Sequence, residues 1–207
     1  PRIGKWGLYD SLYAGGSCFI KDAGSLAHQL EQSGTHATLV RNILEANVFQ
    51  RDHFLSRAET EVGMDWSGKT VALLGLAFKQ DTNDIRNSGA IGIIQQLLGA
   101  GVKEIRVYDP AAMPMTKGYF NLEKNDLYRR ISYTKNSQDA LAGTDVSIIC
   151  TDWSQFKTLA DTIVNETTTP HLIMDGRRII AHSFDMLREK GYDIIAVGSP
   201  FIKGDTQ

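Results

Sequence analysis

Residues 70–75 read TVALLG, a continuous apolar run that ends in glycine. A strand that is apolar at every position is typical of a parallel sheet that is covered on both faces. Further strands are predicted along the chain at 104–108 (EIRVY), 145–150 (DVSIIC), 171–174 (HLIM) and 193–197 (DIIAV). The sequence therefore predicts several strands of one parallel sheet.

Helical segments alternate with these runs. Apolar spacing and turn residues predict helices at 88–98, 137–142, 154–164 and 182–190. Strands that alternate with helices are typical of βαβ units, whose crossovers are right-handed. We therefore expect an α/β fold with a Rossmann-like, doubly wound parallel sheet.

A helical region precedes the predicted sheet. Residues 1–22 are rich in Gly, Tyr and Ser without a clear period, and we expect them to form a loop. Apolar residues at helical spacing predict a helix over 22–33 and a longer one over 36–62. The longer helix exceeds the usual globular length, so it is either a strut between domains or a dimer interface, and we favour the dimer.

The turn at 65–69 (DWSGK) separates the two patterns. We place the domain boundary there. Residues 1–66 would form a cysteine loop and part of a helical domain, and residues 67–207 would form the sheet domain.

The composition excludes several classes of protein. A net charge of -2 offers no basic surface for nucleic acid, and no apolar run approaches the roughly 18 residues that span a membrane. Two cysteines are too few for a disulfide framework, which indicates a reducing, cytoplasmic compartment. The histidines and cysteines lack metal-ligand spacing, so we expect no metal site. The chain begins at Pro1 without a Met, and we expect it to be a fragment.

The ends of the predicted strands carry candidate binding residues. Ligands of an open parallel sheet bind at the carboxyl ends of its strands. The first turn (GLAFK, 75–79) has one glycine where the dinucleotide fingerprint needs three, so we expect no standard pyrophosphate cradle. Lys79 and Arg177 would instead attract a diphosphate, and Phe78 would stack on a base. The alternative is that Lys79 and Arg177 are solvated surface charges.

The most informative loop is GGSCFIKD, residues 15–22. Two glycines allow a ligand to approach the backbone closely, and Cys18 follows them just before a helix predicted to begin at about Asp22. Helix-terminal amides and Lys21 would favour the thiolate, and Asp22 would hold a water or take a proton. This pattern favours covalent catalysis through sulfur. The alternative for Cys18 is a small buried side chain, which is the interpretation that we favour for Cys150.

Together these motifs resemble the UDP-glucose/GDP-mannose dehydrogenase family over nearly the whole chain. The matching motifs, in the order of the family, are GGSCFIKD (15–22), GLAFKQDTNDIRNS (75–88), VYDPAAM (107–113), TDWSQF (151–156) and DGRR (175–178). The resemblance implies a central helical domain that dimerises and a Rossmann-like domain that binds UDP. It also implies that the amino-terminal NAD-binding domain of the family is absent from this chain.

The resemblance also implies roles for single residues. Cys18 would be the nucleophile, and Asp22 would help to activate water. The positions that match NAD contacts are Cys18, Lys21 and Arg86. The positions that match substrate contacts are Arg2, Tyr9, Gly15, Gly16, Phe78, Lys79 and Arg177, with Arg2 reaching the substrate of a neighbouring subunit.

The implied reaction is the oxidation of a hexose C6 alcohol to a carboxylate with two NAD, through a thiohemiacetal and a thioester on the cysteine. We expect a UDP-sugar substrate, with UDP-glucose favoured by Ser17 and Lys21. Family members usually have a glycine and an aromatic residue before the two glycines, where this chain has Tyr13 and Ala14. The alternatives are another UDP- or GDP-hexose dehydrogenase, or a nucleotide-sugar-binding module without catalysis.

Overall fold

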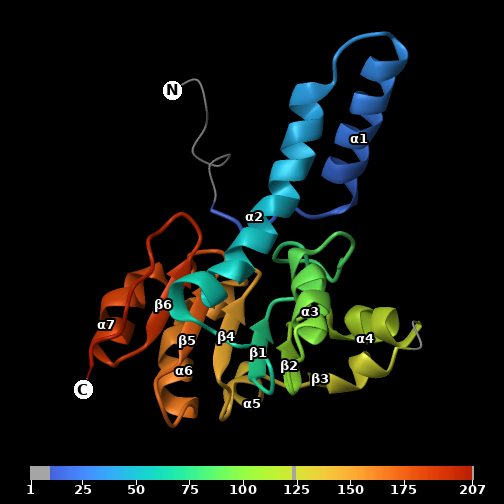
Figure 1. Ribbon diagram of the computed structural model, residues 1–207. Coiled ribbons are helices and arrows are strands. Elements are labelled where there is room, and N and C mark those ends of the chain that lie inside the picture. The colour runs from blue at the N-terminus through green and yellow to red at the C-terminus, as the bar shows by residue number, and fades with distance from the viewer. Residues whose placement is uncertain (1–9, 123–124, 207) are drawn as a thin grey trace.

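The computed structural model describes residues 10–122 and 125–206 and contains one six-stranded parallel sheet (Figure 1). The order of its strands is β3-β2-β1-β4-β5-β6. The strands are β1 Thr70–Leu74, β2 Glu104–Tyr108, β3 Ile131–Tyr133, β4 Val146–Ile149, β5 Leu172–Asp175 and β6 Asp193–Ala196. This order, which reverses direction between β1 and β4, is that of a doubly wound sheet and confirms the predicted fold class.

Helices cover both faces of the sheet. The helices that follow β1 along the chain are α3 Gly89–Gly99, α4 Met113–Leu122, α5 Ser137–Leu141, α6 Leu159–Glu166 and α7 Phe184–Glu189. Val71 and Leu73 of β1 share a core with α3 and α4, whereas Ala72 and Leu74 share a second core with α5, α6 and α7. Because successive strand residues point to opposite faces, a fully apolar strand fits both cores.

The amino-terminal helices form a hairpin that projects from the sheet (Figure 1). They are α1 Ser17–Gln32 and α2 Thr38–Val62. The last turns of α2 pack into the sheet core through Phe54, Leu55 and Ala58. Arg57 fastens them further, since its Nη1 donates to the carbonyl of Ala196 at 2.8 Å.

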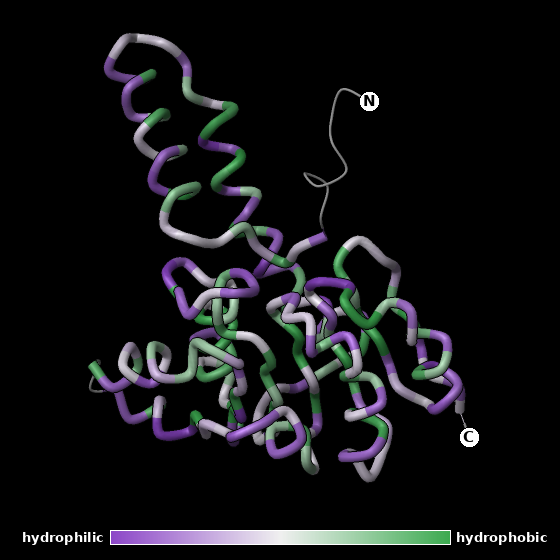
Figure 2. Tube along the Cα trace, turned by 180° about the vertical axis from the view of Figure 1, so that it is seen from behind, coloured by the Kyte–Doolittle hydropathy of each residue, from purple (hydrophilic) through white to green (hydrophobic). Residues whose placement is uncertain are grey.

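The projecting part of the hairpin exposes large apolar side chains. Figure 2 shows hydrophobic segments along it, far from the sheet core. The exposed apolar residues of the hairpin are Phe19, Leu26, Leu39, Ile43, Val48 and Phe49. Within the described residues, the hairpin therefore buries only part of its apolar surface.

The prediction that α1 begins at about residue 22 is wrong, because the helix begins at Ser17. Its apolar spacing continues back to Phe19, four residues before Ala23, and the glycines before it hid this start. Gly16 occupies the N-cap with φ of 90°, a conformation that glycine adopts at little cost. Cys18 therefore lies in the first turn of a helix and not in a loop.

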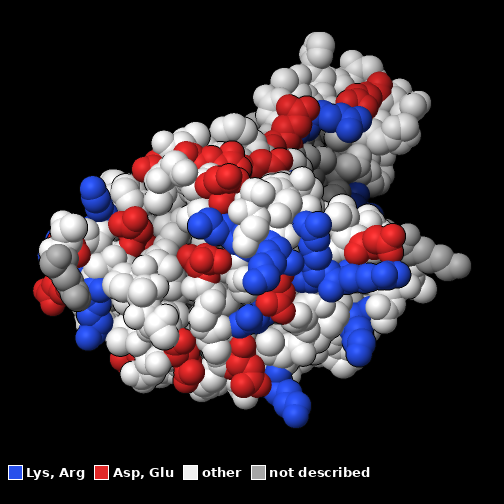
Figure 3. All heavy atoms as spheres, turned by 60° about the horizontal axis from the view of Figure 1, so that its bottom comes forward, with Lys and Arg blue, Asp and Glu red and all other residues white. Residues whose placement is uncertain are grey.

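Two features concern the surface of the described residues. On the face shown in Figure 3, a group of Lys and Arg side chains lies beside Asp and Glu side chains, so positive charge there is balanced locally. Among the helices of the described part of the chain, none is both long enough and apolar enough to cross a bilayer.

Candidate active site

Residues 10–16 run across the carboxyl ends of the strands. At the β5 end, the amide of Leu12 donates to the carbonyl of Gly176 at 2.9 Å. A Cβ on Gly176 would lie 2.2 Å from Leu12 Cδ2, so this crossing requires glycine. The segment then continues to the turn after β1, where it leads into α1. The fold thus brings the cysteine loop to the edge where a parallel sheet binds ligands.

The two glycines of this loop pack against the turn that follows β1. The amide of Gly16 donates to the carbonyl of Arg86 at 3.1 Å, and Asn87 Nδ2 donates to the carbonyl of Gly16 at 3.2 Å. A Cβ on Gly15 would lie 2.5 Å from the carbonyl oxygen of Asn87, and one on Gly16 would lie 3.0 Å from the Phe78 ring. The predicted site residues Gly15, Gly16, Phe78 and Arg86 therefore lie together.

Cys18 is exposed in the first turn of α1. Lys21 and Asp22 follow three and four residues later, so all three lie on one face of the helix. Lys21 Nζ lies 3.2 Å from Asp22 Oδ1, with both side chains well exposed to solvent. The cation and the carboxylate are thus paired about one helical turn after the cysteine.

Arg86 lies beside Cys18 and is held by its neighbour Asp84. Its Nη2 lies 2.8 Å from Asp84 Oδ2. Hydrogen bonds from the Arg86 side chain lower the pKa of Asp84 below its usual value, against a smaller effect of burial. The same hydrogen bonds and the charge of Asp84 raise the pKa of Arg86. Arg86 is therefore a permanent cation near the cysteine.

The turn after β1 is organised by a buried aspartate and offers no free cradle for a pyrophosphate. Asp109 Oδ2 accepts the amides of Leu76 and Ala77 at 2.7 and 3.1 Å, and also the indole Nε1 of Trp153. In phosphate-binding turns, amides like these point at the ligand. Lys79 extends beyond the turn, exposed, with its Nζ 5.6 Å from the centre of the Phe78 ring.

Arg177 lies at the end of β5 and is mostly buried. Its Nη2 lies 2.9 Å from Asp152 Oδ2, and its Nη1 donates to Ser11 Oγ at 2.7 Å. Among the described residues, Arg177 Nε and Asp152 Oδ1 are buried without a hydrogen-bond partner. Trp66 Nε1 and His171 Nδ1 share this property elsewhere in the fold. Arg177 is thus not the solvated surface charge of the alternative interpretation.

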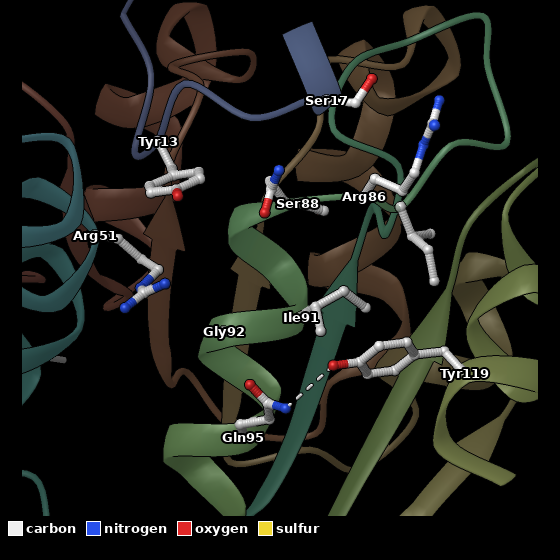
Figure 4. A pocket seen from close by; sticks show the side chains of 11 residues that line it. Tyr13, Ser17, Arg51, Arg86, Ser88, Ile91, Gly92, Gln95 and Tyr119 are labelled. Carbon is white, nitrogen blue, oxygen red and sulfur yellow. Dashed lines mark hydrogen bonds between the residues drawn. The ribbon is translucent and has the colours of Figure 1, made fainter. Parts of the chain in front are cut away.

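A cleft of about 520 Å³ opens beside the cysteine loop (Figure 4). Ser17 and Arg86 lie at one end of it, Tyr13 and Arg51 at one side, and Tyr119 at the other end. The Arg51 guanidinium lies 5.5 Å from the centre of the Tyr13 ring. This volume is within the range of small-molecule sites.

The remaining predictions concern Cys150, Arg2, Tyr9 and metal binding. Cys150 is buried, and burial raises the pKa of its thiol, so the structural role predicted for it is confirmed. Arg2 and Tyr9 lie outside the described residues. In the described part of the chain, no three His, Cys, Asp or Glu side chains are grouped as a metal site would need.

Sequence reasoning missed the polar residues that support the loop. Asn47 of α2 contacts Ala14, and Asn87 contacts Gly16. The motif around 75–88 includes Asn87, but its spacing alone gave no reason to single that residue out. Asp109 had a clearer signal, because it directly follows a predicted strand.

The family comparisons agree with this geometry. Residues 72–182 match the model of the UDP-glucose/GDP-mannose dehydrogenase family, UDP binding domain. The chain is 33% identical over 205 residues to UDP-glucose 6-dehydrogenase TuaD of Bacillus subtilis, covering 98% of this chain and 42% of that protein. It is 35% identical over 179 residues to UDP-glucose 6-dehydrogenase AglM of Haloferax volcanii, covering 86% and 39%. The chain thus spans about 40% of the length of these relatives.

Solved structures show the same similarity. A UDP-glucose dehydrogenase from Pyrobaculum islandicum superposes with a TM-score of 0.73 at 27% identity, covering 86% of this chain and 38% of that one. A UDP-D-ManNAc dehydrogenase from Pyrococcus horikoshii gives a TM-score of 0.68 at 25% identity, covering 91% and 39%. The chain therefore belongs to the UDP-glucose/GDP-mannose dehydrogenase family.

Proposed function

We propose that this chain supplies the uridine-nucleotide site and the catalytic cysteine of an NAD-dependent UDP-glucose 6-dehydrogenase. The observation that carries the proposal is the contact between the Gly15–Gly16 loop and the Phe78 turn. This loop packs on the carboxyl edge of the sheet, and Cys18 follows it by two residues along the chain. A nucleotide bound at this edge would present its sugar to the sulfur.

The nucleotide site would lie across the ends of β1, β4 and β5. Phe78 offers a ring for stacking and Lys79 an exposed ammonium group, while Arg177 offers a donor that no described residue uses. Two cations on separate strands suit a diphosphate, whose charge is spread over several oxygens. The position also agrees with the rule that ligands bind where the strand order reverses.

Cys18 would act as the nucleophile. Once the C6 alcohol has become an aldehyde, the sulfur adds to the carbonyl carbon, and the oxygen takes up a proton to give a thiohemiacetal. Loss of a second hydride and of that proton gives a thioester. Water then attacks the thioester carbon and releases the carboxylate and the Cys18 thiol. Covalent capture keeps the aldehyde from leaving between the two oxidations.

Asp22 and Lys21 would assist at the sulfur. Asp22 lies one helical turn after Cys18, where its carboxylate would orient the attacking water and accept a proton. Lys21 is paired with Asp22, and its ammonium group would favour negative charge on the reacting atoms.

NAD fits this chain only as a contact at its edge. The amides of the β1 turn are occupied by Asp109, so the described sheet lacks a dinucleotide cradle. Arg86, Cys18 and Lys21 would contact the cofactor at the cleft. When bound, each of two successive NAD molecules accepts one hydride, and a separate NAD-binding domain would hold most of the cofactor. We therefore expect no turnover from this chain alone.

A homodimer would complete the site. The exposed apolar side chains of the hairpin, Leu39 and Phe49 among them, suit burial against a second copy. Arg2 would then reach the substrate of the partner subunit, and Tyr9 would lie in the loop around the sugar. The protein would work in the cytoplasm.

A UDP-sugar other than UDP-glucose is the second candidate substrate. The structural similarity to a UDP-D-ManNAc dehydrogenase motivates this alternative, as does Tyr13 beside the glycines. Both candidates require a uridine nucleotide, so they share the nucleotide site and differ at the sugar.

Calorimetric titration with UDP, UDP-glucose and GDP tests the nucleotide site. We expect UDP and UDP-glucose to bind and GDP to bind at least about tenfold more weakly, since each lost polar contact costs of the order of 1.4 kcal/mol. Lys79→Ala and Arg177→Ala should each weaken UDP at least about tenfold. The matched control is Lys103→Ala. Lys103 is an exposed lysine just before β2, at the opposite end of the strands. Equal binding of all three ligands, or none, contradicts the proposal.

A whole protein that carries this chain tests the chemistry. It should form NADH with UDP-glucose and lose that activity in Cys18→Ala. Turnover with another UDP-sugar but not with UDP-glucose would select the alternative substrate. Full activity in Cys18→Ala would exclude the covalent route.

A further inference from the structure

Two asparagine side chains from different parts of the chain form hydrogen bonds with the loop before Cys18. Asn47 comes from α2 and Asn87 from the segment before α3, at separations of 33 and 71 residues from their loop partners. Both bind backbone atoms of the loop rather than side chains. The loop is therefore held in place by residues outside the motif that contains the cysteine.

Asn47 makes a two-point contact with Ala14. Its Oδ1 accepts the Ala14 amide at 2.7 Å, and its Nδ2 donates to the Ala14 carbonyl at 2.9 Å. An amide side chain has both an acceptor and donors, whereas a carboxylate has acceptors alone. Asn also ranks low as a helix former, and Asn47 lies in the interior of α2. Its contact with the loop, not the helix, accounts for the residue type.

Asn87 makes the second contact, with Gly16. Its backbone has φ of 49°, a left-handed conformation that Asn tolerates better than most residues. This conformation aims its Nδ2 at the Gly16 carbonyl, at 3.2 Å, while its own carbonyl lies against Gly15. The neighbouring Arg86 carbonyl accepts the Gly16 amide. Both polar backbone groups of Gly16 are thus fixed by residues 86–87.

The helix that carries Cys18 depends on these contacts for its position. Its N-cap, Gly16, has no side chain to bind the free amides of the first turn. The last fixed points before Cys18 are therefore Ala14 and Gly16. Gly16 also packs on the Phe78 ring, which the proposed function assigns to the nucleotide site.

We propose that Asn47 and Asn87 are positioning residues that set Cys18 relative to the uridine-nucleotide site. They join α2, the loop and the β1 turn into one unit, so that a nucleotide on Phe78 and the sulfur on α1 keep a fixed separation. Neither asparagine touches the reacting atoms. This inference rests on the proposed roles of Cys18 and Phe78.

The first test measures amide hydrogen exchange in the ligand-free chain. In Asn47→Ala, the Ala14 amide should exchange at least about tenfold faster than in the original chain, because its acceptor is gone. In Asn87→Gly, which keeps the backbone conformation accessible, the Gly16 amide keeps its acceptor, the Arg86 carbonyl, but its exchange should still rise because the Gly16 carbonyl loses its donor and the loop is held less firmly. Asn42→Ala, an exposed asparagine of the same helix, should change neither. Unchanged exchange in both variants would overturn the inference.

The second test separates positioning from simple stabilisation. Bound UDP-glucose should slow alkylation of Cys18 by iodoacetamide, because it places the sugar near the sulfur. In Asn47→Ala and Asn87→Gly, we expect this protection to fall at least about threefold while the Kd for UDP-glucose stays within about threefold. Asn47→Asp, which keeps the acceptor for the Ala14 amide, should retain part of the protection that Asn47→Ala loses.

The two tests separate the possible failures. Unaltered protection in both variants with intact binding would overturn the inference and leave the proposed function standing. If UDP-glucose does not bind the original chain, the proposed function fails, and hydrogen exchange alone decides whether the asparagines hold the loop.

Discussion

The two cysteines occupy opposite environments within one chain. Cys18 is exposed in the first turn of a helix, beside Arg86, Lys21 and Asp22. Cys150 directly follows β4, 8% exposed, in the apolar core, where burial raises the pKa of its thiol. The same side chain is thus exposed to solvent in one place and fills space in the core in the other. Burial and neighbouring charge, not residue type, decide which cysteine can do chemistry.

The largest expected contrast is in the rate of alkylation. Iodoacetamide reaches Cys18 in the folded chain, whereas Cys150 reacts only when its surroundings open. If that opening costs about 4 kcal/mol, the rate for Cys150 is lower by about a thousandfold. Mass spectrometry of peptides containing each cysteine would measure both rates at neutral pH. Similar rates would show that the two environments do not differ as described.

A second effect concerns stability at low pH in the buried region around Cys150. His171 lies beside the strand that leads to Cys150, with Nε2 2.8 Å from Ser147 Oγ of β4. Burial lowers the pKa of His171 to about 4 from its ordinary value of 6.5. As the pH falls, His171 is therefore protonated in the unfolded chain before it is protonated in the folded chain. The folded state loses stability as pH falls from 6.5 towards about 4. The loss is of the order of 3 kcal/mol at most.

Urea unfolding at pH 7 and pH 4.5 measures this loss. His171→Asn should remove most of the loss of unfolding free energy that protonation of His171 causes between pH 7 and pH 4.5. A variant with the same acid sensitivity as the original chain would show that His171 is not its source.

Substitution of each cysteine by serine should give a smaller contrast in stability. Cys150→Ser places a hydroxyl group in an apolar core, which costs about 1–3 kcal/mol of unfolding free energy unless it finds a partner. Cys18→Ser, at an exposed position, should change it by less than about 0.5 kcal/mol. Equal destabilisation, measured by urea unfolding, would contradict the assignment of one buried and one exposed cysteine.

The smallest effect on folding is expected at the tip of the hairpin that carries Cys18. Leu39 is 75% exposed, so Leu39→Ser should change the unfolding free energy of the monomer by less than about 0.5 kcal/mol. If the hairpin is a dimer interface, the same change should weaken the dimer in sedimentation experiments. Leu122→Ser, at an 85% exposed leucine on α4, is the control. A dimer that tolerates Leu39→Ser would place the interface elsewhere.

Much of the sheet could be predicted because β1 and β4 are buried at every position and the other predicted strands carry apolar residues that pack in its core. Each segment that was predicted as a strand is a strand in the structure. Strand β3 was missed because it has three residues, of which Ile131 alone is buried. Helix α4 was missed as well. Pro114 and Gly118 are poor helix formers, and Thr116 and Phe120 are the buried residues of this helix, one turn apart.

The residues of the candidate site also divide into those that a local motif reveals and those that it does not. Cys18, Phe78, Lys79, Arg86 and Arg177 stand in local motifs that sequence alone can find, although their roles in binding and catalysis remain proposals. The contacts of Asn47 and Asn87 join residues that are far apart along the chain, so no local pattern reports them. The start of α1 fell between these cases. Its apolar spacing was present, but the two glycines before it looked like a continuing loop.

The most direct test of the account is whether a bound UDP-sugar reaches Cys18. Alkylation of Cys18 by iodoacetamide would be measured with no ligand, with saturating UDP, with GDP and with UDP-glucose, after calorimetry has established binding. The account predicts that UDP-glucose slows the reaction several-fold, that UDP slows it less and that GDP leaves it unchanged, by the rule that only bound ligands protect. An unchanged rate with UDP-glucose bound would show that the nucleotide site and the cysteine are not parts of one active site.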